Sequence, residues 1–384
     1  MTPKDHRIIV SQTVSTISKN DAENNNTSSC AADDVDASIS STTESSSKHK
    51  SLLNLMMISC EENPPYGPSK DTALIFLELL CQAYERKCSR SLLSSSSKES
   101  ETKNREQQIM VSDDTTNLTI SITIYHAQSN DYPLTLSEWS SYDGILIPGS
   151  LSAAYDTQVE WIEKLQSVIR NEIHKMGLKT VGVCFGHQCF AHAFGAHHDV
   201  DVCSREGRAI KCPTGSKAGR ISCKLTQEGR QLLLLDGNSD MEIIMLYTHG
   251  DMVQSLPEFA ISLGGTTNVP IEASAYFSSK EEKILFQKQQ QQTTSTMANG
   301  GDKSSDTAIK VQPYAFTFQA HPEYISPTGF NTTYFNTVQE MEDRGLITQQ
   351  FSKEVREDAK VNFEKVQEDS LSVMIAVATT FGWF

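Results

Sequence analysis

The sequence predicts an α/β protein with a mostly parallel central sheet and helices on both faces. Short apolar runs alternate along the chain with segments of helical spacing, and this order of elements is typical of a parallel sheet. Several of the runs are apolar at successive positions, as in strands that are buried on both faces. Later segments are richer in strand patterns, and the last has helical spacing. We therefore also expect extra antiparallel strands and a C-terminal helical segment.

The individual elements follow from the hydrophobic pattern in chain order. Residues 52–58 (LLNLMMI) form a nearly continuous apolar run, and residues 118–125 (LTISITIY) alternate and are rich in β-branched residues, so both predict strands. Between them, Leu74, Leu77 and Leu80 share one face of a helix over 71–87. Further strands are expected at 143–148, 179–184, 220–225, 243–248, 259–263, 273–277 and 314–319. Further helices are expected after Asp156, which can cap the first of them, over 187–195 and within 334–377.

Three polar segments interrupt this pattern. Residues 1–50 contain no Leu, Phe, Tyr or Trp, so they are predicted to be a disordered extension before one domain over 51–384. Low-complexity stretches near 91–116 and 287–308 are predicted to be surface inserts in that domain, because loop-closure entropy grows slowly with length. Deleting 1–48, or shortening 287–306, is therefore expected to change thermal stability very little.

Composition excludes several function classes. The chain has 33 Lys and Arg against 48 Asp and Glu, a formal net charge of −15, which argues against binding nucleic acid or an anionic membrane through overall charge. No apolar run reaches the length of a transmembrane helix, and the N-terminus lacks a secretory apolar stretch. The nine cysteines are an odd number without a Cys-x-x-Cys pair, so we expect a cytosolic protein and no metal site.

The segment around Cys184 predicts a nucleophile. Gly182-x-Cys184-x-Gly186 follows an apolar strand and precedes a helix, which is the arrangement of a nucleophile elbow. Small residues are needed there because the turn brings backbone segments close together. The helix dipole favours a thiolate, and the amide of Phe185 can donate to a developing oxyanion. A buried structural cysteine beside a tight turn is the alternative.

A second segment supplies the base that a cysteine nucleophile needs. The predicted strand at 314–319 is followed by His321-Pro322-Glu323, in which Glu323 can fold back to orient the imidazole. A third segment, Pro148-Gly149-Ser150, ends the strand before the elbow strand, and its glycine lets a backbone amide approach a substrate carbonyl.

These segments resemble the class I glutamine amidotransferase superfamily. The resemblance rests on Gly149-Ser150, Cys184-Phe185-Gly186-His187-Gln188, Thr248-His249-Gly250-Asp251 and His321-Pro322-Glu323, and it is greatest to the stand-alone branch of γ-glutamyl peptidases and the glutaminase domain of GMP synthetase. It implies a flavodoxin-like three-layer fold and a triad of Cys184, His321 and Glu323. It also implies an oxyanion hole from the amides of Gly149 and Phe185, and a role for Gln188 in holding the γ-glutamyl group. His249 is expected either to shape the substrate pocket or to hydrogen-bond structurally.

The expected reaction is cleavage of a γ-glutamyl amide bond through a thioester on Cys184, without a cofactor. The substrate would be glutamine or a γ-glutamyl peptide. The chain has no Gly-x-x-x-x-Gly-Lys-Ser/Thr phosphate loop, so we favour a self-sufficient hydrolase over a glutaminase subunit that supplies ammonia to a synthetase partner. A catalytically silent binding or regulatory module is the third alternative.

Overall fold

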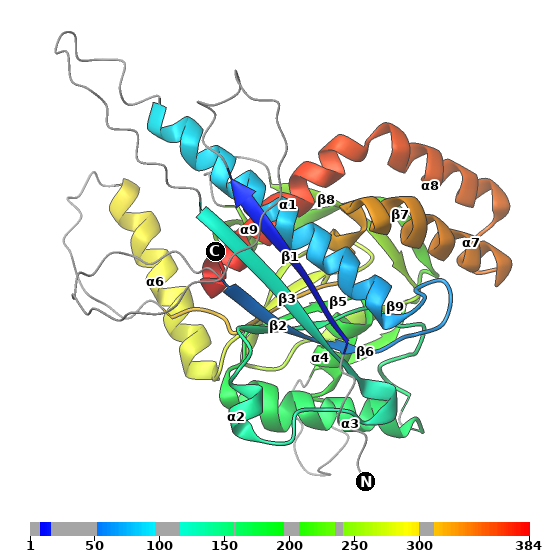
Figure 1. Cartoon of the computed structure of the whole chain (residues 1–384), viewed down its shortest axis with the longest axis horizontal. Helices are drawn as coiled ribbons and strands as arrows, with labels where there is room; N and C mark the ends of the chain where they lie inside the picture. Colours follow the sequence, from blue (N-terminus) through cyan, green and yellow to red (C-terminus); the bar gives the residue numbers. More distant parts are fainter. Residues whose placement is uncertain are drawn as a thin grey trace, which may run out of the picture.

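The structure of the chain is a computed structural model. It describes residues 8–16, 52–96, 116–156, 158–195, 207–234, 241–298 and 311–384. Within those ranges no helix combines the length and the apolar content needed to span a membrane. Figure 1 shows a central sheet with α1 and α9 side by side along it, α6 at one side of the molecule, and α7 and α8 at the other.

The predicted parallel sheet is confirmed. Its five parallel strands are neighbours in the order β3-β2-β4-β5-β12, and every side chain of β4, β5 and β12 is buried. Continuous apolar runs predicted this burial, because a strand covered on both faces needs no polar side. The bounds are β3 (Thr116–His126), β2 (Leu52–Ser59), β4 (Gly144–Ile147), β5 (Thr180–Val183) and β12 (Ala315–Phe318).

Antiparallel strands extend the sheet beyond β12, as the later strand patterns predicted. The order continues β12-β11-β10-β7-β8, and a separate pair is formed by β6 and β9, which the sequence pattern did not reveal. The bounds are β11 (Ala273–Tyr276), β10 (Ala260–Gly265), β7 (Lys217–Leu225), β8 (Glu242–His249), β6 (Arg208–Lys211) and β9 (Asp251–Ser255).

Helices cover both faces of the sheet and create two cores. Along β2, Leu55 and Met57 contribute to the core that contains α1 and α9, whereas Met56 and Ile58 contribute to the core that contains α3 and α4. Successive strand side chains point to opposite faces, so one apolar run serves both cores. The bounds are α1 (Ser69–Ser96), α3 (Glu160–Val168), α4 (Phe185–His192) and α9 (Phe363–Phe381).

The remaining helices include the expected C-terminal segment. The helix after Asp156 begins at Glu160 with Val159 as its N-cap, so the predicted cap at Asp156 is wrong. The bounds are α2 (Leu136–Trp139), α5 (Gln227–Leu233), α6 (Lys280–Ala298), α7 (Phe335–Asp343) and α8 (Gln349–Val361). Single turns of 3-10 helix lie at Ala127–Ser129 and Pro322–Ile325, and π-helical turns at Ile169–His174 and Gly329–Tyr334.

Four predictions about the polar segments need correction. Residues Ile9–Thr16, predicted to be disordered, form β1, which pairs antiparallel with β3 at the edge of the sheet. The two valines of this strand, Val10 and Val14, are only 5% exposed and pack into the core with α1. A deletion of 1–48 would remove these core side chains, so the expectation that it changes thermal stability very little is corrected as well. The predicted inserts also overlap regular structure, because α1 extends to Ser96 and α6 covers 287–298. Residues 17–50, 97–115 and 299–308 of these polar segments lie outside the described residues.

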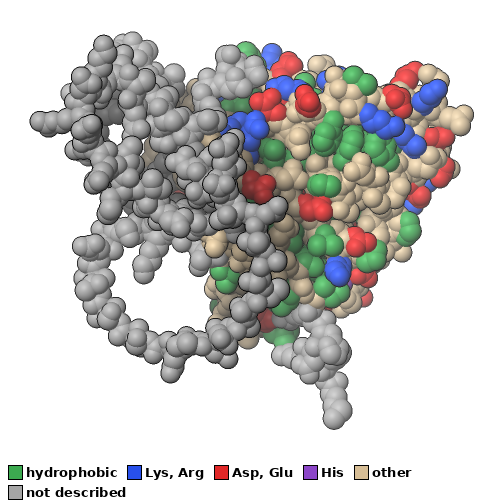
Figure 2. Space-filling view, turned by 45° about the horizontal axis from the view of Figure 1, so that its top comes forward, with side chains coloured by type: hydrophobic (Ala, Val, Ile, Leu, Met, Phe, Trp, Pro, Cys, Tyr) green, Lys and Arg blue, Asp and Glu red, His purple; other side chains and the backbone are tan. Residues whose placement is uncertain are grey.

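The charged side chains are mixed over the described surface in Figure 2. Asp and Glu side chains are interspersed there with Lys and Arg, and apolar side chains lie between them. The acidic excess of the composition therefore does not gather into one patch on that face.

We predict that Val10→Asn lowers the free energy of unfolding by about 1–3 kcal/mol, because it places an amide in the core under β1. The neighbouring Ser11 is exposed, so Ser11→Asn is the matched control and should change stability by less than about 0.5 kcal/mol. Urea unfolding of both variants measures the difference. Equal stability of the two variants would contradict the packing of β1.

Candidate active site

The backbone at Cys184 is strained in the manner of a nucleophile elbow. Cys184 has φ 50° and ψ −103°, between the end of β5 and the first residue of α4. A positive φ is costly for a residue with a Cβ and persists only where the surroundings enforce it. A Cβ added to Gly186 would lie 2.1 Å from the Ile147 carbonyl oxygen, and one added to Gly182 would lie 3.1 Å from the Gly186 carbonyl carbon. Close backbone approach therefore leaves no room for a side chain at Gly186 and little room at Gly182, as the sequence motif predicted.

The pairing of β5 with β12 brings Cys184 close to His321. Val183 is opposite Phe318 in the parallel register, and the Cys184 amide donates to the Phe318 carbonyl oxygen at 2.8 Å. His321 follows three residues after Phe318, and its amide donates to the Leu246 carbonyl oxygen of β8 at 2.8 Å. Because parallel strands end at the same edge, the elbow and the predicted base share that edge.

His321 and Glu323 form a buried pair. Nδ1 of His321 lies 2.7 Å from Oε1 of Glu323, and the two residues are 0% and 4% exposed. Burial by itself disfavours the imidazolium, but nearby Tyr324, Glu323 and Cys184 outweigh it, so the pKa of His321 is raised well above 6.5. Tyr324 also stacks on the imidazole, with ring centroids 4.1 Å apart and an interplanar angle of 2°. The pairing at Nδ1 leaves Nε2 as the nitrogen available to exchange a proton with a thiol.

Gln188 and His249 meet at the Asp251 carbonyl oxygen. Gln188 lies one turn after Cys184 in α4, and its Nε2 donates to Asp251 O and to Gln319 Oε1, each at 3.1 Å. Nδ1 of His249 donates to the same carbonyl at 2.8 Å, which leaves the buried Nε2 without a hydrogen-bond partner. Burial lowers the pKa of His249 to about 4, so its imidazole is neutral at pH 7.

The loop after β4 contributes Gly149 and Ser150. A Cβ on Gly149 would lie 3.3 Å from His321 Cε1, so its backbone borders the imidazole. Ser150, grouped by the sequence reasoning with the substrate-binding and oxyanion residues, donates through its hydroxyl to Glu61 Oε2 at 3.2 Å. Phe185 is the first residue of α4, so its amide is one of the helical amides that have no partner within the helix.

Two residues of the β2–α1 loop belong to this site and were missed by the sequence reasoning. A Cβ on Gly149 would lie 2.9 Å from the Tyr66 hydroxyl oxygen. Burial, followed by the charges of Tyr324 and Cys184, raises the pKa of Tyr66 well above 10. Glu61, 5% exposed, contacts the loop after β4. A signal was present, because 60–66 follows the carboxyl end of a parallel strand, where loops converge on a site.

His187 of the elbow helix serves the fold. His187 contacts Thr317 Oγ1 through Nδ1 at 2.7 Å and the Ile271 carbonyl oxygen through Nε2 at 3.3 Å. Burial lowers the pKa of His187 to about 3. Across the described ranges, no group of three or more His, Cys, Asp or Glu side chains is arranged to hold a metal ion.

The candidate site thus consists of a strained cysteine elbow and a buried His–Glu pair at one edge of a mostly parallel α/β sheet. The model of the family "Glutamine amidotransferase class-I" matches residues 102–341, and the chain belongs to this family.

Curated relatives match parts of the chain. A Saccharomyces cerevisiae protein named as a candidate glutamine amidotransferase is 34% identical over 141 residues, which are 35% of this chain and 49% of that protein. Gamma-glutamyl peptidase 3 of Arabidopsis thaliana is 25% identical over 61% of this chain and 72% of its own length. The glutamine-hydrolyzing GMP synthase of Wolinella succinogenes is 26% identical over 35% of this chain and 22% of its own length. The chain thus spans about half of the yeast relative and most of the peptidase.

We predict that His187→Gln flattens the pH dependence of stability in acid. The folded-state pKa of about 3 lies below the unfolded value of 6.5, so between these values the unfolded chain binds a proton that the folded chain does not. The free energy of unfolding of the wild type should therefore fall as the pH drops through this window. In the variant, this fall should be smaller than in the wild type by up to about 1.4 kcal/mol per pH unit. Urea unfolding at pH 4, 5, 6 and 7 measures both slopes. Parallel slopes would show that His187 is charged in the folded protein.

Proposed function

We propose that the protein hydrolyses γ-glutamyl amide bonds through a thioester on Cys184. The observation that carries the proposal is the buried His321–Glu323 pair at the strand edge that also bears the strained Cys184. Two different strands supply these groups, and a purely structural cysteine would require neither the strained backbone nor the adjacent buried pair.

The proposed chemistry assigns each proton to a named atom. Nε2 of His321 already holds the thiol proton, as its raised pKa favours, so Sγ of Cys184 adds as the thiolate to the side-chain amide carbon of the substrate. The oxyanion then accepts hydrogen bonds from the amides of Gly149 and Phe185. As the C–N bond breaks, the imidazolium gives its proton to the departing amine. Water, deprotonated by His321, then attacks the thioester and releases glutamate and the Cys184 thiolate, which restores the starting pair.

The other residues of the site have supporting roles in this proposal. Glu323 fixes the tautomer of His321 and stabilises the imidazolium that forms at each step. Gln188 has its Nε2 engaged, so its Oε1 is the atom that would hold the γ-glutamyl group. His249, neutral and with Nε2 free, would accept a hydrogen bond in the substrate pocket.

A glutaminase subunit is the alternative, and the match to GMP synthase favours it. That match covers only 22% of the synthase, whereas the match to the γ-glutamyl peptidase covers 72% of the peptidase. The fuller coverage supports the stand-alone hydrolase as the first choice.

We predict that Cys184→Ala lowers turnover by at least about 1,000-fold, because it removes the nucleophile and leaves only the binding groups. Glutamate release from glutamine, glutathione and γ-glutamyl dipeptides measures turnover. Cys189→Ala is the matched control, since Cys189 lies on the same helix in the apolar core, and it should retain activity within about threefold. Turnover by a folded Cys184→Ala protein would overturn the assignment.

We predict that the isolated protein forms the thioester without a partner. Rapid quench followed by mass spectrometry should detect a γ-glutamyl adduct on the peptide that contains Cys184. Accumulation or steady turnover with γ-glutamyl peptides supports the hydrolase. A protein that is inert to every γ-glutamyl compound alone, yet active in cell extract with ATP and an acceptor, would establish the subunit instead. Inertness under both conditions would favour a silent binding module.

A further inference from the structure

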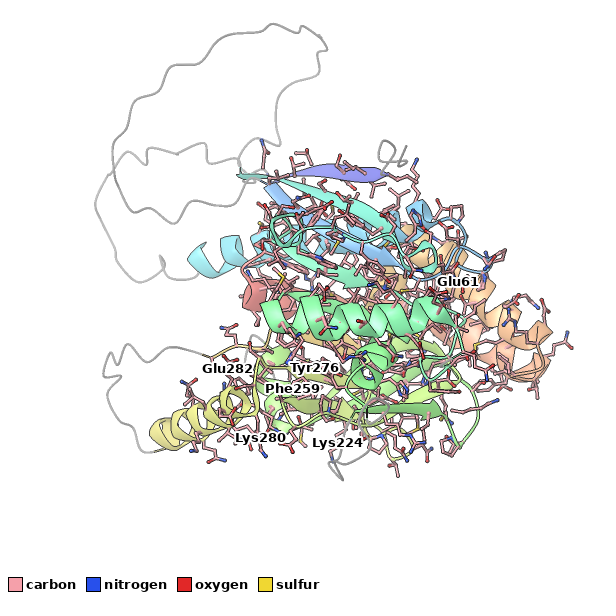
Figure 3. The ribbon with its side chains drawn as sticks, turned by 90° about the horizontal axis from the view of Figure 1, so that it is seen from below. Glu61, Lys224, Phe259, Tyr276, Lys280 and Glu282 are labelled. Carbon is pink, nitrogen blue, oxygen red and sulfur yellow. The ribbon has the colours of Figure 1, made fainter. Side chains whose placement is uncertain are left out.

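We propose that the Glu61 carboxylate is a positioning residue that holds the loop after β4 in the shape required for oxyanion binding. This inference rests on the proposed function, but the outcome of its experiment can be distinguished from a failure of the proposed function. Glu61 lies at the end of the sheet opposite Lys280 and α6 in Figure 3, which is the end where the parallel strands β2 and β4 stop.

The carboxylate joins two loops that are distant in sequence. Oε1 accepts from the amides of Glu62 at 3.1 Å and Asn63 at 3.0 Å, and from Asn63 Nδ2 at 2.8 Å, all within its own loop. Oε2 accepts from Ser150 Oγ and from the Leu151 amide, each at 3.2 Å, in the loop after β4. Each oxygen therefore holds one loop, and the carboxyl group connects them.

The partners of Glu61 match the acceptor capacity of a carboxyl group. All five contacts come from donor groups: the amides of Glu62, Asn63 and Leu151, and two side chains. A carboxylate offers acceptors on both oxygens, whereas the amide of a glutamine would turn an NH₂ group towards one of the two donor sets. Since Glu61 is 5% exposed, water has little access to compensate such a mismatch.

The loop that Glu61 holds is the one that carries Gly149. The Leu151 amide fixes the orientation of the peptide group between Ser150 and Leu151, and the Ser150 hydroxyl also accepts from the Ser152 amide at 3.1 Å. These bonds pin the chain immediately after Gly149, which borders His321. The same β2–α1 loop places the Tyr66 hydroxyl beside His321 at Gly149, 2.9 Å from where a Cβ of Gly149 would lie. A preorganised donor is effective only where its direction is fixed before the charge develops, so Glu61 acts through the loop and not on the substrate.

Two reagents separate this role from a general effect on the fold or on the thiol. p-Nitrophenyl acetate acylates a thiol through a tetrahedral oxyanion: the S–C bond forms, the C–O bond breaks and p-nitrophenolate leaves. Iodoacetamide alkylates the same thiol by direct displacement: the S–C bond forms, iodide leaves and no oxyanion develops. Loss of oxyanion positioning should slow the first reaction and spare the second.

The experiment compares wild type with Glu61→Gln, Ser150→Ala and the control Glu62→Gln. Glu62 is the adjacent residue, with its side chain 53% exposed and paired to His126. The p-nitrophenolate burst and the iodoacetamide rate are measured after subtraction of a Cys184→Ala background, and folding is checked by circular dichroism and melting. We expect Glu61→Gln to acylate about 10–100-fold more slowly and Ser150→Ala about 3–10-fold more slowly, with alkylation within about twofold of wild type. Glu62→Gln should match wild type in both reactions.

The outcomes separate the two proposals. If γ-glutamyl compounds are turned over, Glu61→Gln should also lower kcat by a similar factor while KM changes by less than about threefold. If no γ-glutamyl compound reacts but the acylation defect of Glu61→Gln persists, the proposed substrate is wrong and the role of Glu61 stands. Three results would each overturn the role of Glu61. They are an equal loss of rate in both reactions, no loss of rate in acylation, and a wild-type Cys184 that p-nitrophenyl acetate does not acylate. If Glu61→Gln fails to fold, an unaltered acylation rate of folded Ser150→Ala would overturn it.

Discussion

The structure of the site depends on the parallel pairing of β5 with β12. These two short strands are far apart in the sequence and entirely buried, so their backbone groups must find partners in each other and in their neighbours. Their register places Val183 opposite Phe318, which sets Cys184 and His321 at one edge of the sheet. Without this pairing, the elbow and the His–Glu pair would be two unrelated local motifs.

Close packing at that edge maintains the strained backbone of Cys184. Gly186 lies against the Ile147 carbonyl oxygen at the end of β4, so the elbow, the elbow helix and the β4 strand are fitted with no room for a side chain. A positive φ costs on the order of 1–3 kcal/mol, and a tightly packed core on both faces of the sheet is what can sustain it. The packing around the elbow therefore also determines the geometry of the site.

Three histidines near the elbow show how environment decides the behaviour of one residue type. His187 and His249 are buried against hydroxyl and carbonyl groups, and burial lowers the pKa of each below the neutral range. His321 is equally buried but faces a carboxylate, and its pKa moves in the opposite direction. A neutral imidazole can orient groups in the fold, whereas an imidazole paired with Glu323 can gain and lose a proton at acceptable cost.

The sequence by itself determined the sheet class and most strands, and it pointed to Cys184, His321 and Glu323 as candidates, because hydrophobic periodicity and short motifs are local properties. It did not reveal β1, since Val10 and Val14 gain their burial only from tertiary contacts with α1 and β3. Nor did it reveal that the Ser150 hydroxyl contacts Glu61. The contributions of Glu61 and Tyr66 were decided by tertiary structure alone, because they act through loops that meet only where the parallel strands end together.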